Sequence, residues 1–200
     1  MIRNFVFDVG DVLIEFRYRD YMRDLGFSEQ AVQDLSEKMV LTEYWHEMDL
    51  GIHSETDAVK DFSLILPEYR DEIRRFWECP DELVREYPYA APMLKELKDR
   101  GFGVYILSNY PKEMAERHWP GFQFMKYTDG HIISAFEKMC KPNLCIYRLL
   151  LERFRLDPAE CLFIDDRQGN VDGAGKAGME ALLFTGYDSL KDSIASIENP

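Results

Sequence analysis

Polar side chains that can do chemistry follow three short apolar runs of the sequence. A carboxylate follows the run NFVF, a hydroxyl and an amide end the run GVYILSN, and two successive carboxylates follow CLFI. A lysine stands in the expected loop before a further helix. The candidate functional residues are Asp8, Ser108, Asn109, Lys141, Asp165 and Asp166, and Ser108, Asn109 and Lys141 are the ones among them predicted to bind substrate.

These residue types suit phosphoryl transfer assisted by a divalent cation. A carboxylate such as Asp8 can attack phosphorus to give an acyl phosphate, but two anions must first be brought together. Mg²⁺ held by Asp8 and Asp166 would neutralise the charge between them. Ser108 can donate a hydrogen bond to a phosphoryl oxygen, and Lys141 supplies a positive charge. Oxygen ligands without a Cys or His cluster favour Mg²⁺ over zinc.

The elements that must position these residues alternate between strands and helices. A helix over residues 90–100 has Pro92 near its start and Gly101 after its end, and further helices begin at Asn143 and near Gly169. This alternation predicts a doubly wound α/β parallel sheet, in which ligands bind at the carboxyl ends of the strands. The apolar runs predict strands at residues 3–8, 102–109, 132–134, 161–166 and 181–184.

A helical insertion interrupts this pattern after the first strand. Residues 17–86 contain no clear strand, and helices are expected to begin at Ser28, Ser54 and Pro67. We therefore predict a core domain of residues 1–16 and 87–200 and a helical cap domain of residues 17–86, joined by short hinges near Phe16 and Tyr87. The last residues, 188–200, resemble a closing helix that frays.

Composition and charge narrow the classes of partner. The chain has 200 residues with 24 Lys plus Arg against 37 Asp plus Glu, and the net charge of −13 disfavours nucleic acid. No stretch approaches the roughly 18 apolar residues of a membrane helix, so we expect no membrane partner. Four cysteines without a CxxC pair indicate a reducing, cytoplasmic location. The sequence leaves the oligomeric state open.

The segments FVFDVGDVL, ILSN, Lys141-Pro142 and FIDDRQGNVDGA resemble, in order, the four motifs of the haloacid dehalogenase-like (HAD) hydrolase superfamily. The resemblance implies a Rossmann-like core with a helical cap, a nucleophile at Asp8, phosphoryl binding by Ser108 and Lys141, and Mg²⁺ binding by Asp165 and Asp166. The DxG opening is similar to that of the subgroup containing α-glucose-1-phosphate phosphatases. The expected substrate is a small phosphorylated metabolite, such as a sugar phosphate.

One position departs from the pattern of the family's phosphatases. Most of them carry a second aspartate two residues after the nucleophile, which acts as general acid and base, whereas this chain has Gly10. The Gly10 carbonyl can still ligate the metal, but the proton donor is missing, a contribution of about 10²–10⁴-fold in rate. The proton can instead come from Asp11, from a cap residue or from water. Alternatively, a substrate with a good leaving group needs no proton donor.

Further residues have both a functional and a structural interpretation. Trp45 and His46 in the cap segment EYWHEMDLG can stack on or hydrogen-bond to a sugar, although Trp45 also suits the cap core. Asn170 and Asp172 can begin and cap a helix, while the family resemblance places Asn170 near the metal.

Two other functions remain open. An aspartate can attack carbon without a metal in a dehalogenase, which Gly10 permits. Alternatively, the chain is a phosphate-binding module with little turnover. A phospho-receiver domain would share the chemistry, but its acidic pair comes early in the chain and its acceptor in the middle, the reverse of the order here.

Overall fold

The computed structural model describes residues 1–197, and these are built around one five-stranded parallel sheet. The spatial order is β5-β4-β1-β6-β7, which puts the first strand in the centre, and all neighbouring strands are parallel. The predicted doubly wound α/β fold is confirmed. The strands are β1 (Asn4–Phe7), β4 (Gly103–Ser108), β5 (Gly130–Ile133), β6 (Cys161–Asp165) and β7 (Glu180–Leu183).

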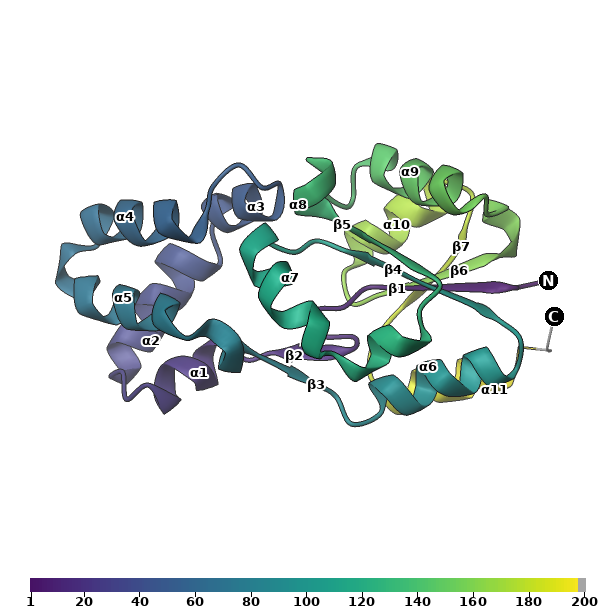
Figure 1. Cartoon of the computed structure of the whole chain (residues 1–200), viewed down its shortest axis with the longest axis horizontal. Helices are drawn as coiled ribbons and strands as arrows, with labels where there is room; N and C mark the ends of the chain where they lie inside the picture. The colour runs from purple at the N-terminus through teal and green to yellow at the C-terminus, as the bar shows by residue number, and fades with distance from the viewer. Residues whose placement is uncertain (198–200) are drawn as a thin grey trace.

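Helices cover both faces of the sheet (Figure 1). Because successive strand residues point to opposite faces, Phe5 and Phe7 enter one apolar core and Val6 enters a second one. Burial on both sides explains why the central strands are continuous apolar runs. The first face is covered by α6 (Ala90–Asp99) and α11 (Tyr187–Ala195), the second by α9 (Leu144–Phe154) and α10 (Gln168–Lys176).

A group of helices lies beside the sheet and comes from the expected insertion (Figure 1). Ser28 accepts a hydrogen bond from the Ala31 N–H and so caps the second of these helices, while Ser54 forms a capping box with Asp57. Residues Ser36–Val40 continue the second helix as a π-helical turn. The helices are α1 (Tyr18–Asp24), α2 (Glu29–Leu35), α3 (Glu43–Asp49), α4 (Glu55–Ile65) and α5 (Arg70–Glu78).

The expectation that residues 17–86 lack a strand is wrong. Strand β3 (Val84–Glu86) pairs antiparallel with β2 (Ile14–Phe16), so a two-stranded ribbon connects the inserted helices to the sheet. Three residues with the sequence VRE are too short to show an alternating pattern, and the strand is defined by its partner. The division into core and cap domains at residues 16 and 87 stays a prediction.

The remaining elements lie near the carboxyl ends of the strands. Helices α7 (Lys112–His118) and α8 (Ser134–Glu137) follow β4 and β5. The expected closing helix is present as α11, while residues 198–200 of that prediction lie outside the described part. Within residues 1–197, every helix is too short or too polar to cross a membrane.

Candidate active site

The topology brings the ends of three strands together. Because β4 and β6 flank β1 in parallel, Phe7 is in register with Ile106 on one side and with Ile164 on the other. Asp8 follows β1, whereas Ser108 and Asp165 are the last residues of their strands. Residues 57 to 157 positions apart in the sequence therefore meet at one edge of the sheet, as parallel topology requires.

Lys141 lies between two of the carboxylates. Its Nζ is 2.8 Å from Asp8 Oδ1 and 2.7 Å from Asp165 Oδ2, and its side chain is 0% exposed. Burial alone would lower the pKa of Lys141, but the two carboxylates raise it above its usual value. The ammonium thus remains charged and compensates the negative charge of the site.

Asp165 has hydrogen-bond donors on both oxygens. Oδ1 accepts from the Arg167 N–H at 2.8 Å and from Asn170 Nδ2 at 3.0 Å, and Oδ2 accepts from Lys141 Nζ and from Asn170 Nδ2 at 3.1 Å. Its side chain is completely buried. These bonds make Asp165 well suited to hold Lys141 and Asn170 in place.

Asp8, Asp165 and Asp166 form an acidic cluster in which one oxygen of each lies within 4.8 Å of the others. Burial, and then the neighbouring carboxylates, raise the pKa of Asp8 to about 7 although Lys141 opposes this shift. Burial and Asp165 also raise the pKa of Asp166. Crowded buried carboxylates of this kind are stabilised by a cation, and an all-oxygen donor set fits Mg²⁺.

The bonds within the cluster distinguish the candidate ligands. Asp165 already accepts four hydrogen bonds, and Asp8 Oδ1 accepts from Lys141 and from the Val9 N–H at 2.7 Å. Asp8 Oδ2 and the half-exposed Asp166 are therefore the carboxylate oxygens best placed to ligate a metal. Gly10 is also half-buried beside this loop, with its carbonyl as a further candidate ligand.

Ser108 and Asn109 differ in how their side chains are placed. The Ser108 side chain is completely buried, and its hydroxyl donates to the Asn109 carbonyl at a long 3.5 Å. The Asn109 side chain bonds to the backbone of Lys141, donating to its carbonyl at 3.0 Å and accepting from its N–H at 2.8 Å. Asn109 thus fixes the lysine loop, and binding of substrate by its side chain would require these two bonds to break.

The alternative residues near the site have other partners. Asp11 is exposed, adopts a left-handed backbone conformation with φ 54°, and accepts a hydrogen bond from the Phe16 N–H. Asn170 and Asp172 lie inside α10, which begins at Gln168, so the expectation that they begin or cap this helix is wrong. Asn170 instead faces Asp165.

Trp45 and His46 both lie on α3 and are half-buried. The Trp45 ring lies 5.8 Å from the Trp77 ring and 5.5 Å from the Phe16 ring. These contacts join the inserted helices to the β2–β3 ribbon, in agreement with the structural interpretation of Trp45. Sugar binding by Trp45 and His46 stays a prediction.

Sequence reasoning missed Asp49, the last residue of α3. The Ser134 hydroxyl donates to the Asp49 carbonyl at 2.6 Å and accepts from the Tyr110 N–H at 3.0 Å. Tyr110 directly follows the Ser108–Asn109 pair, so Asp49 is attached to the loop at the end of β4. No motif marks Asp49 among the 37 acidic residues, because its position depends on how α3 docks.

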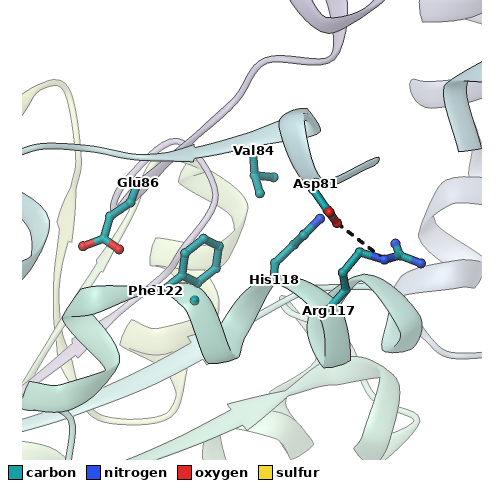
Figure 2. Close-up of a pocket in the computed structure, with 7 residues that line it drawn as sticks. Asp81, Val84, Glu86, Arg117, His118 and Phe122 are labelled. Atoms are coloured by element: carbon teal, nitrogen blue, oxygen red, sulfur yellow. Dashed lines mark ion pairs between the residues drawn. The ribbon is translucent and has the colours of Figure 1, made fainter. Parts of the chain in front are cut away.

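A surface hollow of about 350 Å³ lies apart from this cluster, between β3 and the end of α7 (Figure 2). His118, which lines it, already bonds to the Pro80 carbonyl and the Tyr110 hydroxyl. Arg117 makes two 2.8 Å bonds to Glu55 of α4. The arginine beside the hollow therefore connects α7 to the inserted helices. Both His118 and Arg117 already have hydrogen-bond partners within the protein.

The family comparison covers most of the chain. A model described as haloacid dehalogenase-like hydrolase matches residues 2–178. The sesquiterpene phosphatase astK of Aspergillus oryzae is 28% identical over 189 residues, which cover 92% of this chain and 90% of that protein. (S)-2-haloacid dehalogenase 1 of a Pseudomonas species is 26% identical over 190 residues, covering 90% and 83%.

A solved structure agrees with the fold. A HAD family enzyme of Bacteroides thetaiotaomicron, crystallised with magnesium and inorganic phosphate, superposes with a TM-score of 0.73 and 23% identity, covering 94% of this chain and 97% of that one. The similarity includes both the sheet and the inserted helices.

Proposed function

Since this chain belongs to the haloacid dehalogenase-like hydrolases, we propose that it is a Mg²⁺-dependent phosphatase that hydrolyses a small phosphomonoester through an aspartyl phosphate. The observation that carries the proposal is the buried group at the edge of the sheet, where Lys141 bridges Asp8 and Asp165 and Asp166 lies alongside. The group combines a nucleophile, a positive charge and oxygen ligands in one place.

In the proposed reaction Asp8 attacks phosphorus, and water then hydrolyses the acyl phosphate. The Ser108 hydroxyl, whose hydrogen bond to the Asn109 carbonyl is long at 3.5 Å, donates to a phosphoryl oxygen. Lys141 holds Asp8 in position through the 2.8 Å contact and adds positive charge at the phosphoryl group. Asp165 and Asn109 keep Lys141 in place through its side chain and its backbone, respectively.

The proposed metal ligands are Asp8, Asp166 and the Gly10 carbonyl, with Asp165 supporting the site through its hydrogen bonds. Bound there, Mg²⁺ would neutralise charge between the nucleophile and the phosphoryl group. Its presence would also favour the ionised form of Asp8, whose pKa is raised to about 7 by burial.

For the substrate we propose a sugar phosphate, and a sugar 1-phosphate in particular, because its anomeric oxygen is a good leaving group for an enzyme with Gly10 in place of an aspartate. The half-buried His46 and Trp45 on α3 are the residues proposed to contact the sugar. The A. oryzae relative is a sesquiterpene phosphatase, so a prenyl phosphate belongs in the same comparison.

The test is phosphate release from a panel of sugar phosphates, nucleotides, a prenyl phosphate and an aryl phosphate with Mg²⁺. The controls are Asp8→Asn and EDTA. Release that requires both Asp8 and the metal supports the proposal. If nothing is released while Mg²⁺ and phosphate raise the melting temperature, the chain is a phosphate-binding module instead.

A dehalogenase is the second candidate function, because a dehalogenase is among the relatives and Gly10 does not prevent attack on carbon. That reaction would release halide from a 2-haloacid, and EDTA would leave the rate unchanged. Halide release in EDTA without phosphate release from any ester would replace the phosphatase proposal.

A further inference from the structure

The proposed reaction needs a proton donor that the loop after β1 does not supply. Gly10 has no side chain, and Asp11 is exposed and bonded to the Phe16 N–H. In phosphoryl transfer the attacking and leaving oxygens are roughly in line with phosphorus. Because Asp8 attacks from the end of the sheet, the leaving oxygen points away from the sheet, toward the elements that cover it.

Helix α3 is the inserted helix that docks beside this edge, next to α8 (Figure 1). Its docking is specific: a Cβ at Gly51 would lie 2.6 Å from the Ala135 carbonyl oxygen, and Lys138 Nζ donates to the Gly51 carbonyl. Gly51 has φ +63°, a backbone conformation that residues other than glycine rarely adopt. The turn after α3 is thus built for contact with α8.

The contact between α3 and α8 places Asp49 beside the loop at the end of β4. Its carbonyl accepts from the Ser134 hydroxyl at 2.6 Å, and the same hydroxyl accepts from the Tyr110 N–H of the loop at the end of β4. Asp49 is a partly exposed residue whose carboxyl lies within electrostatic range of Asp8, Lys141 and Arg167. Asp49 belongs to the inserted helices, yet its backbone is linked through Ser134 to the residue that directly follows Ser108 and Asn109.

Asp49 also interacts electrostatically with the nucleophile and its neighbours. Burial raises the pKa of Asp49 to about 7, Asp8 adds to this shift, and Arg167 and Lys141 oppose it. Its own charge contributes, after burial, to the raised pKa values of Tyr110 and Cys140. A carboxyl with a pKa near neutrality can both donate and accept a proton at physiological pH.

We propose that Asp49 is the general acid and base of the phosphatase reaction, in the place of the aspartate that Gly10 lacks; this inference rests on the proposed function. In the first step the Asp8 carboxylate forms a bond to phosphorus, the bond from phosphorus to the leaving oxygen breaks, and Asp49 gives its proton to that oxygen. In the second step water attacks phosphorus and gives a proton to the Asp49 carboxylate, while the bond from phosphorus to the Asp8 oxygen breaks. The products are the free alcohol and phosphate, with both carboxyl groups returned to their starting states.

Two further substitutions test the proposed role of Asp49 as proton donor, one that restores a donor and one that serves as a control. Within residues 1–197, a Cβ at Gly10 would meet no heavy atom within 4 Å apart from those of its own chain neighbours, so Gly10→Asp can restore a carboxylate without steric conflict. Glu47→Gln supplies the control on the same helix, because Glu47 contacts His53 at 3.0 Å, within the inserted helices.

The experiment compares Asp49→Asn with the wild type on an alkyl phosphate and on an aryl phosphate whose leaving group needs no proton. We expect Asp49→Asn to lower kcat on the alkyl phosphate by about 10²–10⁴-fold. With the aryl phosphate the variant should release phenol in a rapid burst and then accumulate phosphorylated protein, which mass spectrometry detects. The burst also demonstrates that the variant is folded.

Gly10→Asp combined with Asp49→Asn should recover activity on the alkyl phosphate, while Glu47→Gln should match the wild type. The inference is overturned if Asp49→Asn stays within about threefold of the wild type on both substrates, or if it only raises KM. Equal loss on both substrates without a burst would likewise overturn it. If the wild type shows no Asp8-dependent phosphate release, the proposed function fails together with this inference.

Discussion

Replacing Lys141 with methionine is expected to destabilise the protein strongly while leaving its packing volume nearly unchanged. The Lys141 side chain is 0% exposed and lies 2.8 Å from Asp8 and 2.7 Å from Asp165. Removing one partner of a buried ion pair typically costs about 3–5 kcal/mol, because the other charge stays buried without compensation. Total stabilities are about 5–15 kcal/mol, so this loss is a large fraction.

The destabilisation caused by Lys141→Met should depend on pH, because it changes the pKa of Asp8. Burial raises the pKa of Asp8 to about 7 in the folded chain, from an ordinary value of 3.8, so the folded state holds a proton that the unfolded state has lost between these pH values. Stability from this group is present at low pH and is lost as pH rises through 7. Lys141→Met removes a charge that lowers the pKa of Asp8, so its destabilisation should be larger at pH 8 than at pH 5.5.

The measurement is urea unfolding at both pH values in EDTA, supported by melting temperatures, which should fall by about 6–20 °C at pH 8 for a chain of this size. Lys112→Met is the control, because that side chain is 56% exposed and its ion pair with Glu116 spans 3.9 Å. The control should stay within about 0.5 kcal/mol of the wild type. A loss below about 1 kcal/mol for Lys141→Met at pH 8, or a larger loss at pH 5.5, would refute the reasoning.

Three further outcomes are expected. Asp166→Asn should abolish the rise in melting temperature that Mg²⁺ produces in the wild type, and a full Mg²⁺ response of the variant would contradict the ligand assignment. Gly51→Ala should destabilise the chain more in urea unfolding than Gly26→Ala, because both glycines have positive φ but only the former would meet other atoms; equal losses would argue against the docked turn. A double-mutant cycle of Arg117→Ala and Glu55→Gln should give a coupling of about 0.5–1 kcal/mol in unfolding free energy, and no coupling would mean that the bidentate pair does not hold α4 against α7.

The sheet was predictable because buried parallel strands leave a strong signal in the sequence. Runs such as FVF and CLFI are apolar throughout, as burial on two faces requires, and each is followed directly by a residue of the site. The order of the motifs therefore predicts which side chains meet. The short strand β3 carried no such signal, because its three residues become a strand only by pairing with β2.

Part of the site could not be predicted, because it depends on contacts between distant segments. The sequence indicates Asn109 as a ligand for substrate, whereas its side chain is bonded to the Lys141 backbone. Asp49 resembles any acidic residue at the end of an amphipathic helix until α3 docks against α8. Its relation to Asp8 is set by tertiary packing, which local patterns do not encode.

The central claim is that Asp8 becomes phosphorylated during turnover, and trapping that intermediate tests it most directly. The protein is mixed with Mg²⁺ and its best phosphomonoester, quenched in acid within one turnover, digested and examined by mass spectrometry. We expect one phosphoryl group on the peptide that contains Asp8 and none in Asp8→Asn or in EDTA. A phosphoryl group on another residue, or unchanged phosphate release by Asp8→Asn, would contradict it.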